Sequence, residues 1–241
     1  MECNYTGPLI IEFDGLPGCG KSTICRQLKK KLEELGHDVC FSYRRKFTPR
    51  NQYWLFFNPK FWHVILSSAR FSRFMDKRQS LSRLVFTPYF IRMYNDFISD
   101  SKNGILLVDQ GIVQSILSLA HTDSIPTSNS LNQLIAACKM ETIPIILINC
   151  QASLNVVNTR MIKRPNDYSR IGKLPKEGRL QSLKIQESNL SYILKCLTKV
   201  FPNISQFCIN TENPVENNVN DIITFITNRL KVNNSPIYSR N

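Results

Sequence analysis

The hydrophobic residues of this chain fall into short continuous runs, separated by longer segments with helical spacing. Five of the runs are rich in Ile, Leu and Val and do not alternate with polar residues, which is typical of strands buried on both faces of a parallel sheet. The expected strands are Leu9 to Phe13, Val39 to Tyr43, Ile105 to Val108, Ile143 to Ile148 and Phe207 to Asn210.

The segments between these runs carry apolar residues on one helix face. In the first of them Ile24, Leu28 and Leu32 share a face, and Gly36 is a suitable residue to end the helix. Strands that alternate with helices predict an α/β fold with a parallel sheet. We expect one three-layer domain over residues 1–232 and a flexible tail over 233–241. The other expected helices are Val113 to Ala120, Leu131 to Cys138, Leu154 to Ile162, Leu180 to Val200 and Val219 to Leu230.

The connection between the second and third expected strands is unusually long. It covers residues 44–103, whereas an ordinary crossover needs only about a dozen residues. A connection of that length is expected to have structure of its own, and we predict a helical insertion.

A glycine-rich segment follows the first strand and opens the first helix. Its sequence fits G-x-x-x-x-G-K-[ST], in which glycines let backbone N–H groups and the helix N-terminus surround a phosphate. Lys21 is expected to reach the β- and γ-phosphates of ATP, and the Ser22 hydroxyl to bind Mg²⁺. The phosphate-binding residues are expected to be Gly15, Leu16, Pro17, Gly18, Cys19, Gly20, Lys21, Ser22 and Thr23.

Two aspartates follow apolar runs at the edge of the sheet where ligands of open α/β folds bind. Asp109 follows the third strand and is the expected carboxylate partner of Mg²⁺, although an Asp there could also cap the next helix. Asp14 precedes the glycine-rich segment. It could hydrogen-bond an acceptor, activate the acceptor's hydroxyl, or stabilise the loop.

A basic cluster follows the fourth strand. Phosphoryl transfer spreads negative charge over equatorial oxygens, which arginines can neutralise when a site closes. Arg160 and Arg164 are four residues apart, so one helix would present both on the same face. The alternative is a solvated basic surface. The cluster consists of Arg160, Lys163, Arg164, Arg170 and Lys173, of which the three arginines are candidate catalytic residues.

These residues resemble the P-loop kinases of small molecules, most closely the nucleoside and nucleotide kinases of the thymidylate kinase type. The resemblance rests on the segment Phe13 to Thr23, on Asp109 and on the segment Asn158 to Arg164. It implies a P-loop NTPase sandwich with five parallel strands in the order 2-3-1-4-5. It also implies that ATP lies on the loop with Mg²⁺, that the acceptor lies under the 44–103 connection, and that residues from about 159 to 179 form a lid.

Two positions differ from the pattern of that family. Gln110 follows Asp109, where thymidylate-type kinases usually have an Arg that holds the acceptor's phosphate. Arg44 and Arg45 follow the second strand, where deoxynucleoside kinases usually have a Glu that acts as the base. Binding of ATP and Mg²⁺ is unaffected by either change, but the identity of the acceptor stays open.

The positive charge of the chain is concentrated in the long connection. The chain has 31 Lys and Arg against 18 Asp and Glu, a formal net charge of +13. Residues 44–92 contain eleven basic residues and one acid, Asp76, and so carry +10 of that charge, interleaved with aromatic residues that include both tryptophans.

Four interpretations of this basic aromatic segment compete. It could be an acceptor pocket, in which aromatic rings stack a base while Arg44, Arg45 or Arg92 binds a phosphate. It could be a nucleic-acid surface, or a peripheral membrane element over residues 54–74. It could also be a helical subdomain with an aromatic core and solvated arginines. The family topology favours the acceptor pocket among these four, because it places the acceptor there.

Composition narrows the class of protein further. A hydrophobic fraction of 42% excludes disordered and collagen-like chains. Eight cysteines without a C-x-x-C pair predict buried thiols in a reducing compartment. No secretion signal or apolar span long enough for a membrane is evident, so we expect a cytoplasmic protein. No feature of the sequence indicates its oligomeric state.

Together these features predict a P-loop phosphotransferase that moves the γ-phosphoryl group of ATP to a nucleoside or nucleoside monophosphate. Two alternatives remain open. One is a polynucleotide or RNA 5′-hydroxyl kinase that uses the basic segment to bind a long substrate. The other is a binding or scaffolding protein that uses ATP only as a conformational ligand.

Overall fold

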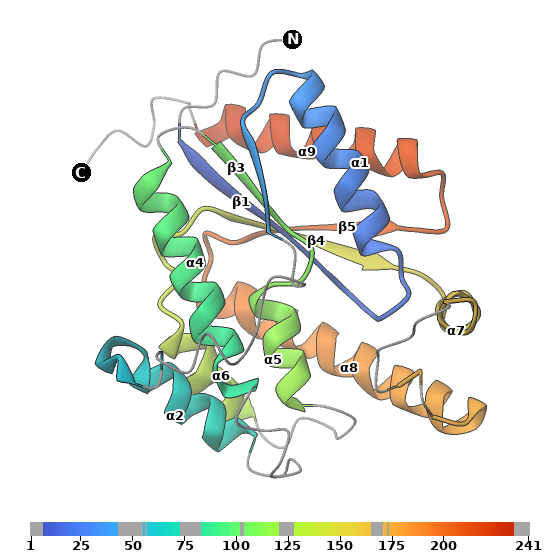
Figure 1. Cartoon of the computed structure of the whole chain (residues 1–241), viewed down its shortest axis with the longest axis horizontal. Coiled ribbons are helices and arrows are strands. Elements are labelled where there is room, and N and C mark those ends of the chain that lie inside the picture. The colour runs from blue at the N-terminus through green and yellow to red at the C-terminus, as the bar shows by residue number, and fades with distance from the viewer. Residues whose placement is uncertain are drawn as a thin grey trace.

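The computed structural model describes residues 7–42, 55, 57–72, 83–101, 104–120, 128–164, 171–172 and 174–233. Within these ranges the chain forms a five-stranded sheet flanked by helices on both faces (Figure 1). The strands are β1 (Pro8–Gly15), β2 (Val39–Ser42), β3 (Gly104–Val108), β4 (Ile145–Gln151) and β5 (Ser205–Asn210).

All four strand pairs are parallel, and the strand order is β2-β3-β1-β4-β5. This confirms the predicted fold class and the predicted order. The fourth strand begins two residues later than expected. The amide of Ile143 donates to the carbonyl of Met140 in a turn, and Pro144 has no N–H to donate to the ladder.

Side chains of β1 alternate between two hydrophobic cores, one on each face of the sheet. Ile11 and Phe13 face α1 (Lys21–Glu34) and α9 (Val215–Asn233), whereas Ile10 faces the opposite layer. That layer contains α4 (Phe86–Asp100), α5 (Ile112–Ala120), α6 (Ser128–Ala137) and α8 (Lys176–Val200) (Figure 1). The molecule is therefore the expected three-layer sandwich.

The ends of the helices agree with the sequence pattern in most places. Helix α1 ends at Glu34, and Gly36 follows with φ 85°, the left-handed conformation expected of a glycine that ends a helix. Helix α9 runs to Asn233, so it includes the first residue assigned to the flexible tail. The rest of that tail lies outside the described residues.

The described parts of the long connection are mostly helical, as predicted. It contains the 3₁₀ turn η3 (Pro59–Phe61), α2 (Trp62–Phe71) and α4. Helix α2 buries Val64, Ile65 and Phe71 and packs against α6, α4 and α5.

Trp62 and Leu66 of α2 are exposed, as is Phe57, which precedes η3 in the sequence. No helix in the described ranges is both long and apolar enough to cross a bilayer. Peripheral contact with a membrane through residues 54–74 stays a prediction.

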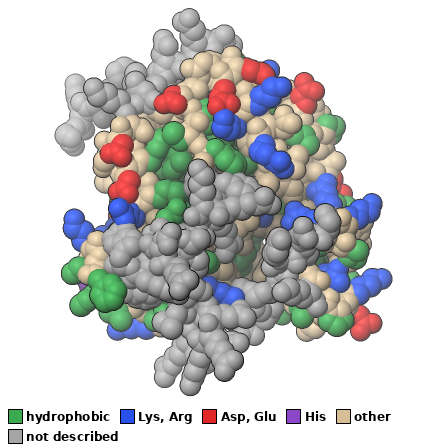
Figure 2. Space-filling view, viewed as in Figure 1, with side chains coloured by type: hydrophobic (Ala, Val, Ile, Leu, Met, Phe, Trp, Pro, Cys, Tyr) green, Lys and Arg blue, Asp and Glu red, His purple; other side chains and the backbone are tan. Residues whose placement is uncertain are grey.

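On the face drawn in Figure 2, the Lys and Arg side chains of the described residues are interspersed with acidic and hydrophobic side chains. Of the basic residues in the connection, Lys60, Arg70, Arg83 and Arg92 lie in described ranges. Arg83 is buried and donates to the carbonyl of Ser118 at 3.3 Å, so it is not part of a solvated face.

Candidate active site

The glycine-rich segment forms a tight loop between β1 and α1. Gly15, Gly18 and Gly20 have φ values of 139°, 90° and 105°, which residues other than glycine rarely adopt. A Cβ on Gly15 would lie 2.4 Å from the carbonyl oxygen of Cys150, and one on Gly18 would lie 2.8 Å from Cγ of Met161. Both positions therefore need glycine for the conformation and for the space.

The side chain of Lys21 bends back over this loop. Its Nζ donates to the carbonyls of Gly15 at 2.7 Å and Leu16 at 2.9 Å, and it lies 3.6 Å from the sulfur of Cys19. The residue is only 6% exposed. The ammonium group is thus held at the loop, where the first backbone N–H groups of α1 also gather.

Ser22 and Asp109 come together at the start of α1. The Ser22 hydroxyl donates to Oδ2 of Asp109 at 2.7 Å, which joins the first turn of α1 to the residue after β3. Oδ1 of Asp109 is buried and has no hydrogen-bond partner among the described residues. Two oxygen ligands at the carboxyl edge of the sheet suit a hard cation such as Mg²⁺, which binds one or two protein carboxylates and completes its shell with water and phosphate oxygens.

Asp14 is completely buried, and neither of its carboxylate oxygens has a partner among the described residues. Burial raises its pKa well above the usual value, the charge of Glu12 raises it further, and the charge of Lys21 opposes both. No described contact of Asp14 distinguishes the three roles left open for it, so each of them stays a prediction.

Arg160 links three parts of the site. From α7 (Leu154–Ile162) its guanidinium donates to the carbonyl of Cys19 at 3.1 Å and to the carbonyl of Thr211 at 3.0 Å. Thr211, directly after β5, also donates its hydroxyl to the Cys19 carbonyl. The expected basic residue is therefore present beside the loop, but its hydrogen bonds hold backbone carbonyls.

The expectation that Arg164 shares a helix face with Arg160 is wrong. Helix α7 ends at Ile162, and Arg164 lies beyond it as an exposed residue. The physical reason is Pro165, since a residue that precedes proline is disfavoured in the helical conformation. Arg170 and Lys173 lie outside the described residues, as does part of the expected lid from 159 to 179.

The predicted acceptor-binding residues are not gathered into one site by the described contacts. Arg44 and Arg45 lie outside the described residues. Arg92, on α4, forms an ion pair of 3.2 Å with Asp96 one turn further along. Gln110 follows Asp109 and is half-buried. Acceptor binding by these four residues stays a prediction.

Sequence reasoning missed a buried acid in β1. Glu12 accepts hydrogen bonds from the Tyr94 hydroxyl at 2.6 Å and from the Val113 amide at 2.8 Å. A Cβ on Gly111 would lie 2.5 Å from the Glu12 carboxyl carbon and 2.2 Å from the Tyr94 oxygen. A lone acid in the apolar run Leu9 to Phe13 was the available signal, because a buried carboxyl group requires a partner.

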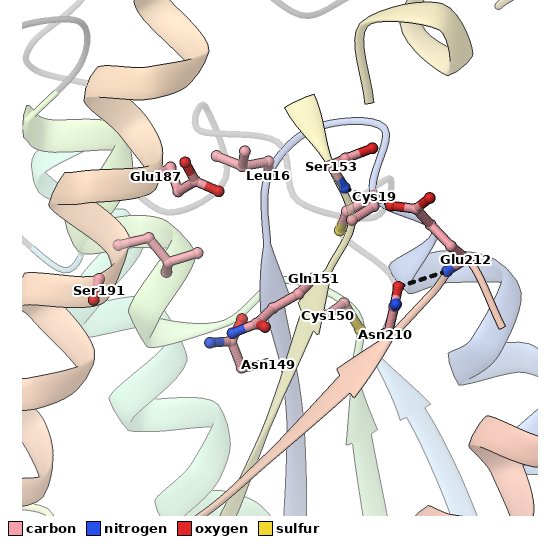
Figure 3. Close-up of a pocket in the computed structure, with 12 residues that line it drawn as sticks. Leu16, Cys19, Asn149, Cys150, Gln151, Ser153, Glu187, Ser191, Asn210 and Glu212 are labelled. Atoms are coloured by element: carbon pink, nitrogen blue, oxygen red, sulfur yellow. Dashed lines mark hydrogen bonds between the residues drawn. The ribbon is translucent and has the colours of Figure 1, made fainter. Parts of the chain in front are cut away.

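A cavity of about 410 Å³ lies beside the loop (Figure 3). Leu16 and Cys19 contribute from the loop, and the ends of β4 and β5 and helix α8 form the other walls. Because Gln151, Glu187 and Glu212 at the cavity are exposed, it opens to solvent.

Two solved structures of deoxyadenosine kinase from M. mycoides are similar to this one. The structure with the products dCMP and a flexible dCDP bound has a TM-score of 0.52 and 16% identity, and the match covers 91% of this chain and 100% of that chain. The structure with bound dATP has a TM-score of 0.50 and 17% identity, with 90% and 99% coverage. The chain has the P-loop NTPase fold of deoxyadenosine kinase. No protein-family model and no curated protein matches its sequence, so the likeness to deoxyadenosine kinase is one of fold.

Proposed function

We propose that this protein is a cytoplasmic P-loop kinase that transfers the γ-phosphoryl group of ATP to a nucleoside or nucleoside monophosphate. The observation that carries the proposal is the 2.7 Å hydrogen bond between Ser22 and Asp109 beside the glycine loop. A loop that binds phosphates needs a cation ligand and an acid at this place only if the phosphates carry Mg²⁺.

The loop would bind the phosphates of ATP through backbone N–H groups and through Lys21. On binding, the Lys21 ammonium would exchange the carbonyls of Gly15 and Leu16 for phosphate oxygens. Both carbonyls belong to the loop and lie within 2.9 Å of the ammonium, so the side chain is already held beside the proposed phosphate site. Positioning and charge neutralisation supply most of the catalysis in phosphoryl transfer.

Ser22 and Asp109 would hold Mg²⁺ when ATP is bound. The unpartnered Oδ1 of Asp109 and the Ser22 hydroxyl are the oxygen donors that fit this cation. Held by these two residues, Mg²⁺ would supply positive charge against the phosphates of ATP.

The lid would act through Arg160, Arg164 and Arg170. Arg160 is already fixed to the carbonyls of Cys19 and Thr211, so we assign it the positioning of the loop against the turn after β5. Arg164 is exposed beyond the end of α7, and we assign it contact with the transferring phosphoryl group.

The nucleoside class of acceptor is supported by the shared fold. The deoxyadenosine kinase with this fold was solved with dCMP, dCDP and dATP. The thymidylate kinase-like alternative needs a group to bind the acceptor's phosphate, and Arg44, Arg45, Arg92 and Gln110 are the candidates. A nucleoside acceptor needs none of them for that purpose.

An acceptor screen tests the proposal. The protein with Mg-ATP is offered nucleosides, nucleoside monophosphates, sugars and 5′-hydroxyl oligonucleotides, and formation of ADP is measured for each. We expect ADP with a nucleoside or a monophosphate. ADP with oligonucleotides alone would indicate a polynucleotide kinase, and ATP binding without any product would indicate a scaffolding protein.

A further inference from the structure

Two buried cysteines lie against each other at the base of the phosphate loop. Cys19 belongs to the loop and is 1% exposed, and Cys150 belongs to β4 and is 2% exposed. Both border Gly15: a Cβ there would lie 2.8 Å from the Cys19 sulfur and 3.3 Å from Cβ of Cys150. The two side chains therefore meet in the same space beside Gly15.

The two sulfurs are chemically unequal. The hydrogen bond from Cys150 lowers the pKa of Cys19, and the charge of Lys21, whose Nζ is 3.6 Å away, lowers it further against the effect of burial. The pKa of Cys150 is raised, first by the hydrogen bond to Cys19 and then by burial. Cys19 therefore has the properties of an attacking thiolate, and Cys150 those of a resolving thiol.

The pair borders a cavity that opens to solvent. Cys19 and Cys150 both line the cavity of about 410 Å³ beside the loop, and exposed residues stand at its opening. Figure 3 shows the Cys19 sulfur pointing inward from the loop. By contrast, the buried Cys25 and Cys138 do not line this cavity.

We propose that Cys19 and Cys150 form a peroxide-sensitive pair that closes a disulfide across the phosphate loop and stops ATP binding. The Cys19 thiolate attacks one oxygen of hydrogen peroxide, the O–O bond breaks, and the leaving hydroxide takes up a proton to become water. Cys150 then attacks the sulfenic sulfur, so that the S–S bond forms and the S–O bond breaks. The hydroxyl leaves with the Cys150 proton as a second water, and the two thiols have together given two electrons to one peroxide.

The effect on ATP follows from the contacts of Cys19 and rests on the proposed function. The same residue supplies the loop carbonyl held by Arg160 and Thr211 and the sulfur beside Lys21. A covalent bond to β4 would pull the loop toward the strand and remove the thiolate that faces Lys21. Bound ATP would restrict movement of the loop and is expected to slow formation of the disulfide.

Peptide mapping of the full chain after treatment with hydrogen peroxide tests the pair. We expect a linked peptide containing Cys19 and Cys150 in the wild type and in Cys25→Ala, a control on the adjacent helix. Cys19→Ser should give neither the link nor an oxidised residue 19, and Cys150→Ser should accumulate a sulfenic acid at Cys19 that dimedone traps. Failure of the linked peptide to form in the wild type would overturn the proposal whether or not the variants fold.

ATP binding is measured on the same samples. Oxidised wild-type protein should lose ATP binding and regain it with dithiothreitol. Cys150→Ser cannot form the disulfide, so it should not lose ATP binding by this route. A linked peptide with unchanged ATP binding would overturn the regulatory part. If reduced wild-type protein bound no ATP, the proposed function would fail, and the mapping would still decide whether the pair exists.

Discussion

The hydroxyl of Tyr94 lies 2.6 Å from Oε2 of Glu12 and ties helix α4 to the central strand of the sheet. Both residues are buried, and the second carboxylate oxygen of Glu12 accepts from the Val113 amide at the start of α5. Burial raises the pKa of Glu12 to about 7, although both hydrogen bonds oppose the rise. The segment from Asp109 to Val113 is therefore held, through the Val113 amide, by a carboxyl group that is partly protonated at neutral pH.

This pair predicts a pH-dependent stability. The folded state holds the Glu12 proton more tightly than the unfolded chain does, because the pKa rises from 4.5 to about 7 on folding. The contribution of Glu12 to the free energy of unfolding is complete below pH 4.5 and is lost as the pH rises through 7. This contribution is at most about 3 kcal/mol.

Glu12→Gln tests this dependence, since the amide keeps an acceptor for Val113 and stays neutral. Chemical unfolding between pH 5 and 8 should show a shallower fall in the free energy of unfolding than in wild-type protein. The raised pKa of Asp14 adds a fall in the same direction, so some slope should persist. Equal slopes in both proteins would refute the role given to Glu12.

Lys21→Ala is expected to abolish or strongly weaken ATP binding. An ammonium bonded to phosphate contributes about 1.5–3 kcal/mol, which corresponds to roughly tenfold to hundredfold in affinity. Binding is measured by calorimetry, and circular dichroism checks the fold. Lys29→Ala is the matched control, because Lys29 lies on the same helix in a surface ion pair with Glu33 that contributes little. Similar affinities in the two variants would show that the phosphate loop is wrongly assigned.

Asp109→Asn is expected to lower turnover and to raise the Mg²⁺ concentration that turnover requires. The amide oxygen can still accept from Ser22, but the charge that binds the cation is lost. Turnover at saturating ATP is measured over a range of Mg²⁺ concentrations. It should fall by on the order of a hundredfold, and the variant should need more Mg²⁺. An unchanged Mg²⁺ requirement would instead favour the helix-capping role for Asp109.

Arg160→Ala is expected to lower both stability and turnover. The substitution leaves the carbonyls of Cys19 and Thr211 without the guanidinium, at a cost of about 1–3 kcal/mol in the free energy of unfolding. A double-mutant cycle with Thr211→Ala should give a coupling energy of about 1 kcal/mol.

Arg164→Ala serves as the comparison for Arg160. Because Arg164 is exposed beyond α7, its loss should change stability by less than about 0.5 kcal/mol. It should lower turnover if the lid neutralises the transferring phosphoryl group. If Arg164→Ala lost as much stability as Arg160→Ala, our distinction between the two arginines would not hold.

Features with a local cause were predictable from the sequence. The apolar runs are strands because both sheet faces are covered by helices. The loop from Gly15 to Ser22 was predictable because its residue types follow one another at fixed spacing in a single short segment. The partnership of Ser22 with Asp109 followed because the carboxyl ends of parallel strands share one edge of a sheet.

Features that depend on tertiary packing were not predictable. The hydrogen bond between Glu12 and Tyr94 joins residues 82 positions apart, and no periodicity connects them. The role of Arg160 depends on Thr211, which becomes its neighbour only when β4 and β5 pair. The ion pair of Arg92 with Asp96 is an exception, because its i,i+4 spacing on a helix is a local feature of the sequence.

The stoichiometry of transfer tests the central claim most directly. Wild-type protein is incubated with Mg-ATP and the acceptor that gives the most ADP, and ADP and phosphorylated acceptor are quantified together by mass spectrometry. We predict equal amounts of the two products, with neither formed by Lys21→Ala. ADP and inorganic phosphate without a phosphorylated acceptor would contradict the assignment of this protein as a kinase.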